Sequence, residues 1–272
     1  MVAYFRKQNN LFMALGALIG FLAMSGAPAW LAFQAGYIRG FLVVLAVFAG
    51  AVIGRLLSAV LATRRIARIT ALLYQEGKPE LFIEKFAGIL KKTPENTAEY
   101  VDGSNKMAYA WEALGEFDQG LKILAGLKPE KLRLHSLSCL SLTTNQRLRL
   151  YLLKEDTVLA GEELARLAGF GRQARDRAPA LADNLKECVY LGENWLRILT
   201  GQKADEEYLR QEIALAKNRI HKGEMLTVLG RYLQQEGRTG EAKELFKEAC
   251  VCGRGLYAGR LAEELQKRTA QR

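Results

Sequence analysis

The N-terminal part of the chain contains 23 consecutive residues without a charged side chain, Leu11 to Phe33. At about 1.5 Å per residue, a helix of this length exceeds the roughly 30 Å hydrocarbon core of a bilayer. A second apolar run extends from Phe41 to Ala62 and is interrupted only by Arg55. The two runs predict two transmembrane helices that form a hairpin, joined by a short external loop at residues 34–40.

Two features of these runs allow other interpretations. Ala27-Pro28-Ala29 fits the small-residue cleavage site of a signal peptide, but the apolar stretch is longer than such peptides usually carry. Arg55 would be unusual in a span, yet a long side chain near a helix end reaches the lipid headgroups. We therefore favour a retained hairpin without a transport pathway.

Basic residues flank the two runs unequally. Two precede the first run and three follow the second, whereas the predicted loop has one: Arg6, Lys7, Arg64, Arg65, Arg68 and, in the loop, Arg39. Because basic flanks stay in the cytoplasm, both termini should be cytoplasmic, with residues 1–10 before the first span and 63–272 after the second. This topology suits an integral protein of a bacterial plasma membrane.

The net charge of +10 is concentrated in the same region. Residues 1–70 contain seven basic residues and no Asp or Glu, leaving 32 basic and 29 acidic residues in the rest of the chain. A nucleic-acid-binding protein should carry its basic excess on the folded module, so we expect no nucleic-acid partner. The four cysteines show no regular spacing and are interpreted as reduced thiols.

Each predicted span carries two glycines separated by three residues: Gly16 and Gly20 in the first, Gly50 and Gly54 in the second. This spacing lets helix backbones approach closely in lipid. The glycines should pack the two spans of one hairpin together, or alternatively mediate self-association between chains.

Beyond residue 62, apolar residues recur at helical and not at strand spacing, which predicts an all-α domain. No Gly or Pro separates Ala62 from Ile66, so the second span should continue directly into the first helix of this domain. Further helices are expected at Leu185 to Leu199 and Tyr208 to Ala216. The stretch from Gly169 to Arg177, with two glycines and three arginines, is predicted to be a linker.

A helix, a glycine turn and a second helix recur in this region, most clearly near the C-terminus. Leu229 and Gly230 lie on the first helix, Gly237 at the turn, and a small-large-small set follows on the second: Ala242, Phe246 and Ala249. The pattern resembles the tetratricopeptide repeat, a family of paired helices about 34 residues long. The resemblance implies an α-solenoid that binds peptides or proteins.

Two further units resemble the family less fully. One has Trp111 on its first helix, Gly115 at the turn and a short second helix. The other has Gly77 at the turn and Pro94 where the family often closes its unit, but Phe82 replaces the expected small residue. Between residues 131 and 200 no clean unit is found, so the resemblance covers about half of this domain.

No constellation of residues indicates catalysis, a cofactor or a metal. His135 and His221 lack convincing partners, and Cys250-Val-Cys252 has no second pair to complete a metal site. Gly169-x-Gly171-x-x-Ala174 and Gly253-x-Gly255-x-x-Ala258 fit a loose dinucleotide-loop pattern, but each follows a helical segment instead of a strand. We interpret both as chance matches.

The sequence therefore favours a membrane-anchored adaptor or scaffold whose helical domain binds protein partners, with the lipid bilayer as its second partner. The alternative is a docking subunit of a membrane complex in which the hairpin selects the partner. An enzyme with an unrecognised helical active site is a third hypothesis. Tyr100, Tyr109 and Trp111 are candidates for either a binding groove or the core, and the core is favoured for Trp111.

Overall fold

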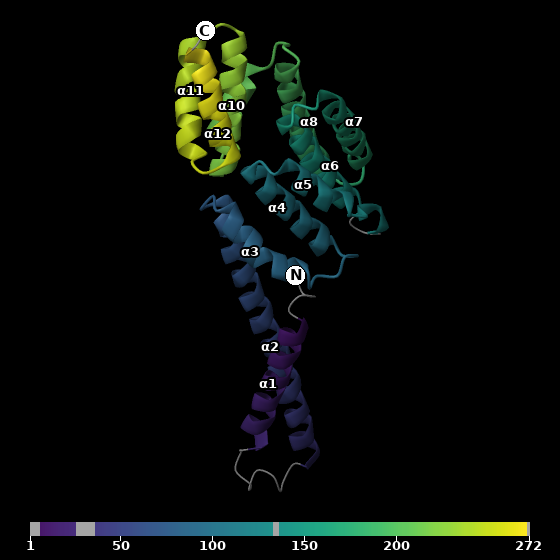
Figure 1. The fold of residues 1–272 in the computed structure, drawn as a ribbon. Coiled ribbons are helices and arrows are strands. Elements are labelled where there is room, and N and C mark those ends of the chain that lie inside the picture. Colours follow the sequence, from purple (N-terminus) through teal and green to yellow (C-terminus); the bar gives the residue numbers. More distant parts are fainter. Residues whose placement is uncertain (1–5, 26–35, 133–135, 271–272) are drawn as a thin grey trace. The chain divides into compact units, whose positions relative to one another are not determined.

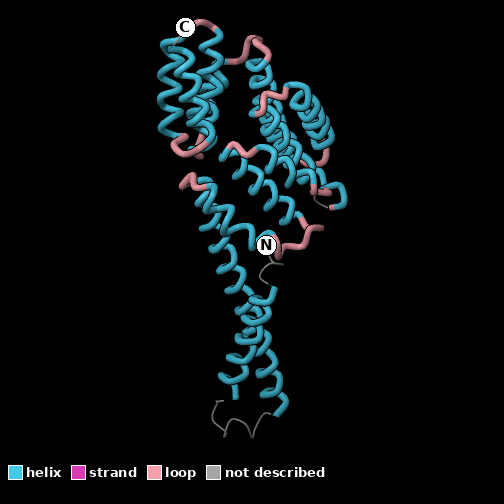
Figure 2. The backbone as a smooth tube through the Cα atoms, in the orientation of Figure 1, coloured by secondary structure: helices cyan, strands magenta, loops and turns pink. Residues whose placement is uncertain are grey.

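The structure, a computed structural model, describes residues 6–25, 36–132 and 136–270. Within these ranges the chain is all-helical, as the sequence predicts, with twelve α-helices and no strand (Figures 1 and 2). It divides into two compact units, Met1–Thr70 and Ala71–Arg272.

The first unit contains α1 (Arg6–Ser25) and most of α2 (Gly36–Tyr74). Within the described residues, one helical stretch, Val44–Tyr74, is long and apolar enough to cross a membrane, and Asn10–Ile19 is a shorter apolar helix. Among the side chains that the structure describes between Leu11 and Leu61, thirteen large apolar ones are exposed. Ala27-Pro28-Ala29 lies outside the described residues.

The boundaries of α2 differ from the prediction at its start and agree with it further on. Gly36–Gly40, expected in the loop, already belong to the helix, because Tyr37, Ile38 and Arg39 contain no helix breaker and a single glycine is tolerated. The helix then continues without interruption through residues 62–68 to Tyr74. The predicted continuation of the second apolar run into the next helix is confirmed.

The second unit contains the end of α2 and ten further helices. These are α3 (Pro79–Leu90), α4 (Ala98–Leu114), α5 (Phe117–Ala125), α6 (Ser136–Leu153), α7 (Thr157–Ala174), α8 (Pro179–Leu199), α9 (Glu206–Leu215), α10 (Arg219–Gln235), α11 (Thr239–Cys252) and α12 (Tyr257–Ala270). Short connections make most successive helices pack against each other. The helices predicted at 185–199 and 208–216 are confirmed as α8 and α9.

The three C-terminal helices, α10, α11 and α12, lie side by side (Figure 1). Ala242, Phe246 and Ala249 are spaced by four and three residues, so they share one face of α11, and all three are fully buried. Leu256 and Leu265 of the terminal segment are also buried and Leu261 is half-buried. These apolar faces form part of the main core of the unit.

Helices α6, α7 and α8 form a second group, in which α7 packs against both of the others. The linker predicted at Gly169–Arg177 is wrong, because α7 continues to Ala174 and only a short turn precedes α8. A glycine in a helix costs about 1 kcal/mol relative to alanine. Here the buried side chains of Leu167 and Ala174, on either side of the two glycines, hold the helix against the core.

Candidate functional site

The second unit buries an ionic cluster that joins three of its helices. Arg149 of α6 lies between two carboxylates, with Nη2 donating to Glu112 Oε1 of α4 at 2.7 Å and to Glu224 Oε2 of α10 at 2.6 Å. Gln146 Nε2 donates to the other oxygen of Glu112 at 2.5 Å. The side chains are almost inaccessible to solvent, 14% exposed for Arg149, 0% for Glu112 and 3% for Glu224.

Burial decides the protonation of this cluster. Loss of solvation raises the pKa of both carboxyl groups, and it raises that of Glu224 to about 8 although Arg149 opposes the shift. Burial alone would lower the pKa of Arg149, but the two carboxyl groups hold it well above its usual value. Burial therefore favours the protonated form of both carboxyl groups, and the guanidinium of Arg149 opposes this by favouring their ionised forms.

The ring of Tyr109 lies beneath this cluster. Its centroid is 5.4 Å from Cζ of Arg149, within the range of a cation–π contact. Tyr74, at the end of α2, stacks on Tyr109 with the two ring centroids 5.6 Å apart. Asn218 Nδ2 donates to the Tyr109 hydroxyl at 2.9 Å. The buried charge is thus held between aromatic and amide side chains, an arrangement that fixes the helices relative to one another.

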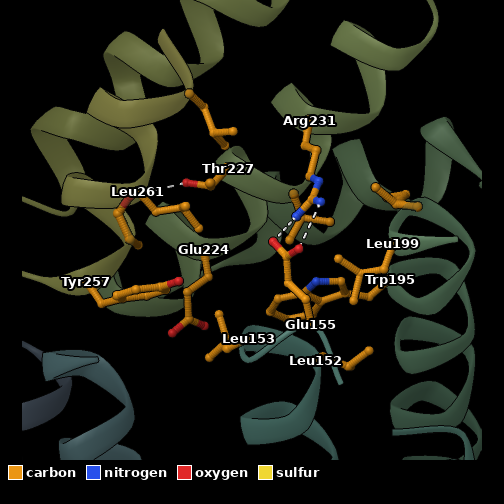
Figure 3. A pocket seen from close by; sticks show the side chains of 14 residues that line it. Leu152, Leu153, Glu155, Trp195, Leu199, Glu224, Thr227, Arg231, Tyr257 and Leu261 are labelled. Atoms are coloured by element: carbon orange, nitrogen blue, oxygen red, sulfur yellow. Dashed lines mark hydrogen bonds and ion pairs between the residues drawn. The ribbon is translucent and has the colours of Figure 1, made fainter. Parts of the chain in front are cut away.

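Glu224 also lines an apolar cavity of about 30 Å³ (Figure 3). Trp195, Leu152, Leu261 and Tyr257 surround it. A cavity of this size holds about one water molecule, whereas ligand pockets measure roughly 300–1,000 Å³. It is a packing defect of the core and not a ligand site.

An ion pair borders this cavity. Arg231 Nη1 donates to Glu155 Oε1 at 2.5 Å, and Glu155 has a φ of 58°, in the left-handed region (Figure 3). Such a backbone costs a residue other than glycine about 1–2 kcal/mol. The pair with Arg231 fixes the strained turn between α6 and α7.

A second pocket, of about 350 Å³, lies over the Tyr74–Tyr109 pair and falls within the size range of ligand sites. We call it the Asn105 pocket. Its lining comes from the end of α2, from α4 and α6 and from the start of α10, and includes Tyr74, Asn105, Tyr109, Gln146, Arg149 and His221. Burial, together with the field of Arg149, lowers the pKa of His221 to about 4, so its imidazole is neutral at pH 7. The lining also contains the charged side chains of Asp102 and Lys106, which form an ion pair with each other.

The glycines expected to pack transmembrane helices lie between α1 and α2. A Cβ atom on Gly16 would collide with the carbonyl oxygen of Gly50, one on Gly50 with that of Gly16, and one on Gly54 with that of Phe12. The two backbones are therefore in direct contact within one chain. The side-chain position of Gly20 lies outside the described residues.

The signature residues of the C-terminal repeat unit come together between α10 and α11. Gly237 lies in the turn with a φ of 79°, a conformation that favours glycine. Leu229 is fully buried, and Gly230 lies directly against the ring of Phe246. This unit is a pair of packed helices whose close contact depends on the small residue.

The turn glycines of the other two predicted units have similar backbone conformations. Gly115 ends α4 with a φ of 81°, and Gly77 follows α2 with a φ of 60°. Arg219 packs on Gly77, and its Nη1 donates to the carbonyl of Glu76 at 3.3 Å. Trp111 is half-buried in α4, and Pro94 is exposed between α3 and α4.

The two loose dinucleotide-loop patterns have structural roles. Gly169 and Gly171 lie inside α7 and face no strand. Gly253 precedes the turn between α11 and α12, where its backbone contacts that of Gly259. Within the described residues no group of three or more His, Cys, Asp or Glu side chains could hold a metal ion. His135 lies outside those residues.

Sequence reasoning singled out Tyr109 of the Asn105 pocket as a candidate for a groove or the core, but it missed the ionic cluster and most of the pocket lining. Glu112 and Arg149 are 37 residues apart, and Arg149 and Glu224 are 75 apart, so no local spacing connects them. The sequence did contain one indication of the cluster. Arg149 interrupts the apolar run from Leu148 to Leu153, and a charged residue on a buried helix face requires a partner of opposite charge.

Comparison with known proteins found no matching family model, no similar curated protein and no similar solved structure.

Proposed function

We propose that this chain is a membrane-anchored, non-catalytic interaction module, an adaptor or scaffold of the bacterial plasma membrane with both termini in the cytoplasm. The observation that carries the proposal is the contrast between the two units. The first leaves long rows of leucine, isoleucine, valine and phenylalanine exposed, whereas the second buries such side chains in a common core. A large exposed apolar surface requires a lipid or protein environment.

Three features support a hairpin of two spans, 11–33 and 41–62, as the anchor. The exposed apolar side chains continue over both α1 and α2. The glycines of the two helices are in contact, as in helix pairs that pack within lipid. The basic residues Arg64, Arg65 and Arg68 are exposed and follow the apolar stretch, where they would face the cytoplasmic headgroups.

The second unit supports the interaction role through its helix pairs. Pairs such as α10–α11 and α4–α5 have glycine turns and apolar faces that only neighbouring helices cover. This organisation is consistent with tetratricopeptide-like stacking, which produces extended binding surfaces. The Asn105 pocket, whose size fits a ligand, supplies a specific place on such a surface.

Topology is tested first. In a background without the four native cysteines, single cysteines at Gln34 and Gln271 are treated with a membrane-impermeant thiol reagent. We expect Gln34→Cys to react in intact cells and Gln271→Cys to react only after permeabilisation. The chain should also remain in the membrane pellet after alkaline extraction. Release by alkali would contradict the anchor, and labelling of Gln271→Cys in intact cells would contradict the orientation.

Partner choice is tested by crosslinking and mass spectrometry in the native cell. The wild-type chain is compared with a chimera in which residues 1–62 are replaced by an unrelated two-span hairpin. If the second unit selects the partner, both chains capture the same proteins. Loss of the partner in the chimera would favour the alternative, a docking subunit whose hairpin selects the complex.

A further inference from the structure

The side-chain amide of Asn105 has one buried atom without a partner. Its Nδ2 donates to the carbonyl of Val101 at 2.8 Å and to Oγ1 of Thr143 at 3.2 Å. A carbonyl oxygen only accepts, so the amide cannot be turned over without losing the bond to Val101. Its Oδ1 has no hydrogen-bond partner within the described part of the chain, although Asn105 is only 4% exposed.

A second buried asparagine in the same unit has the same Nδ2 hydrogen bond, and its Oδ1 does have a partner. Asn194 of α8 is 0% exposed, and its Nδ2 donates to the carbonyl four residues earlier, that of Tyr190, at 2.9 Å. Its Oδ1 accepts from the backbone N–H of Asp205 at 2.7 Å. In both residues Nδ2 donates to the carbonyl four residues earlier. They differ at Oδ1, which accepts a backbone N–H in Asn194 and, among the described residues, has no partner in Asn105.

The unpaired acceptor belongs to a residue that lines the Asn105 pocket. Leaving a buried acceptor unpaired destabilises the free protein, so such an atom calls for an explanation. The oxygen is shielded from solvent in the free chain, and a ligand atom reaches it only after a lining side chain moves. Lys106 is suited to such movement, because it is a long side chain whose ion-pair partner, Asp102, is half exposed.

The charges around the pocket define the chemistry of the ligand. Lys106 pairs with Asp102, and Arg149 pairs with Glu112 and Glu224. An acidic or basic ligand group would therefore find each of these charges already compensated. The side chains of Asn145, Gln146 and Asn218 add further amides to the lining, and Leu142 adds an exposed apolar side chain. This surface favours uncharged amide groups with an apolar substituent.

We propose that the Asn105 pocket docks an extended peptide segment of a partner protein, in which one backbone N–H donates to Oδ1 of Asn105. The inference rests on the proposed interaction function and adds the place and the chemistry of recognition. A backbone N–H of the bound segment donates to Asn105 Oδ1, as the backbone N–H of Asp205 donates to Asn194 Oδ1. An apolar or aromatic side chain of the segment packs on Tyr74 and Leu142.

The experiment uses the full chain in lipid nanodiscs and a display library of random linear peptides. Peptides are selected on the wild-type chain and counter-selected on Asn105→Leu. We expect enriched peptides that are low in charge and bind Asn105→Leu at least about tenfold more weakly, as expected for loss of one buried hydrogen bond. An enrichment of acidic peptides, or equal binding to both chains, would overturn the proposal.

A double-mutant cycle identifies the donor. Each amide of a selected peptide is N-methylated in turn, which removes one N–H at a time. One position should lose about tenfold in affinity on the wild-type chain and almost nothing on Asn105→Leu, because the hydrogen bond is already absent there. The proposal fails if no position shows this coupling, or if no peptide is enriched at all. In either case the partner of Asn105 Oδ1 would be an ordered water molecule and not a peptide.

Asn194→Leu provides the matched control for folding. It removes an amide whose Nδ2 and Oδ1 both have partners and should lower the thermal unfolding midpoint. Asn105→Leu loses only the bonds from Nδ2 and removes an unpaired acceptor, so it should lower the midpoint by less. An Asn105→Leu chain that unfolds as early as Asn194→Leu contradicts the unpaired state. The partner-capture experiment separates this inference from the proposed function. If Asn105→Leu captures the same partner proteins as the wild-type chain, the pocket is not the docking site, but the proposed interaction function still stands.

Discussion

Gly230 lies so close to Phe246 that a Cβ atom at position 230 would be 2.5 Å from Cε1 and 2.8 Å from Cδ1 of the ring. Neither side can relax easily, because Phe246 is fully buried and Gly230 lies inside α10. The contact sets the distance between α10 and α11 and joins two residues of the predicted repeat pattern.

Gly230→Ala should destabilise the second unit by about 1–3 kcal/mol, because the added methyl group overpacks the α10–α11 contact. Chemical unfolding of the purified chain in detergent measures the change. Gly161→Ala is the matched control, since nothing lies within 4 Å of a Cβ at that helical position. It should be neutral or stabilising by up to about 1 kcal/mol. Equal effects of the two substitutions would contradict the close packing.

Arg149→Met should destabilise the same unit by about 3–5 kcal/mol, because it leaves the buried carboxyl groups of Glu112 and Glu224 without their cation. The exposed pair between Arg268 and Glu264 offers a comparison. Arg268→Met should change the free energy of unfolding by less than about 1 kcal/mol. A small effect of Arg149→Met would show that the cluster does not hold α4, α6 and α10 together.

The stability of the second unit should decrease as the pH rises from about 6.5 to 8.5. Burial raises the pKa of Glu224 to about 8, above its unfolded value of about 4.3, so the folded state binds the additional proton. The stabilisation is complete below the unfolded pKa and is lost as the pH passes through the folded pKa. Unfolding free energies at the two pH values measure the loss, which Glu224→Gln should largely remove.

His221 contributes in the opposite direction and in a different pH range. Burial lowers its pKa to about 4, so its stabilisation is present above about pH 6.5 and is lost as the pH falls toward 4. Above pH 6.5 the contribution of His221 is constant, so it does not oppose the loss from Glu224, and Glu224→Gln separates that loss from the one caused by thiols whose pKa burial raises, such as that of Cys188. A wild-type chain whose stability rises between pH 6.5 and 8.5 would show that Glu224 is already ionised.

Gly54→Ile should separate α1 from α2, because its side chain would collide with the backbone carbonyl of Phe12. A photoreactive benzoylphenylalanine at position 12 should crosslink to α2 in the wild-type chain and do so much less in the variant. Ala59→Ile serves as the control, since Ala59 is exposed on the same helix. Crosslinking that survives Gly54→Ile would mean that the glycine contact does not hold the helix pair.

Features determined by local sequence were the ones predicted correctly. Apolar residues at helical spacing predict the all-α fold, and the absence of Gly and Pro after Ala62 predicts the continuity of α2. The failures at Gly36 and Gly169 share one cause. A glycine or a cluster of charges marks only a tendency to break a helix, and neighbouring packing overrides it.

The Asn105 pocket could not be predicted because it is assembled from distant parts of the chain. Tyr74, Asn105, Gln146 and His221 lie on four different helices. Glu112, in contrast, lies four residues after buried Ala108, on the same face of α4. Helical periodicity marks its position as buried, but only the fold supplies its partner, Arg149.

Because Arg149 pairs with Glu112 of α4 and with Glu224 of α10, its two ion pairs form in a fixed order during translation. Glu112 leaves the ribosome before Arg149, so this ion pair can form while the C-terminal helices are still being made. Glu224 follows 75 residues after Arg149, which at about 5–20 residues per second is a delay of several seconds. During this interval the nascent chain holds a half-completed charge cluster, and translation must pass α10 before the second unit can lock into its native arrangement.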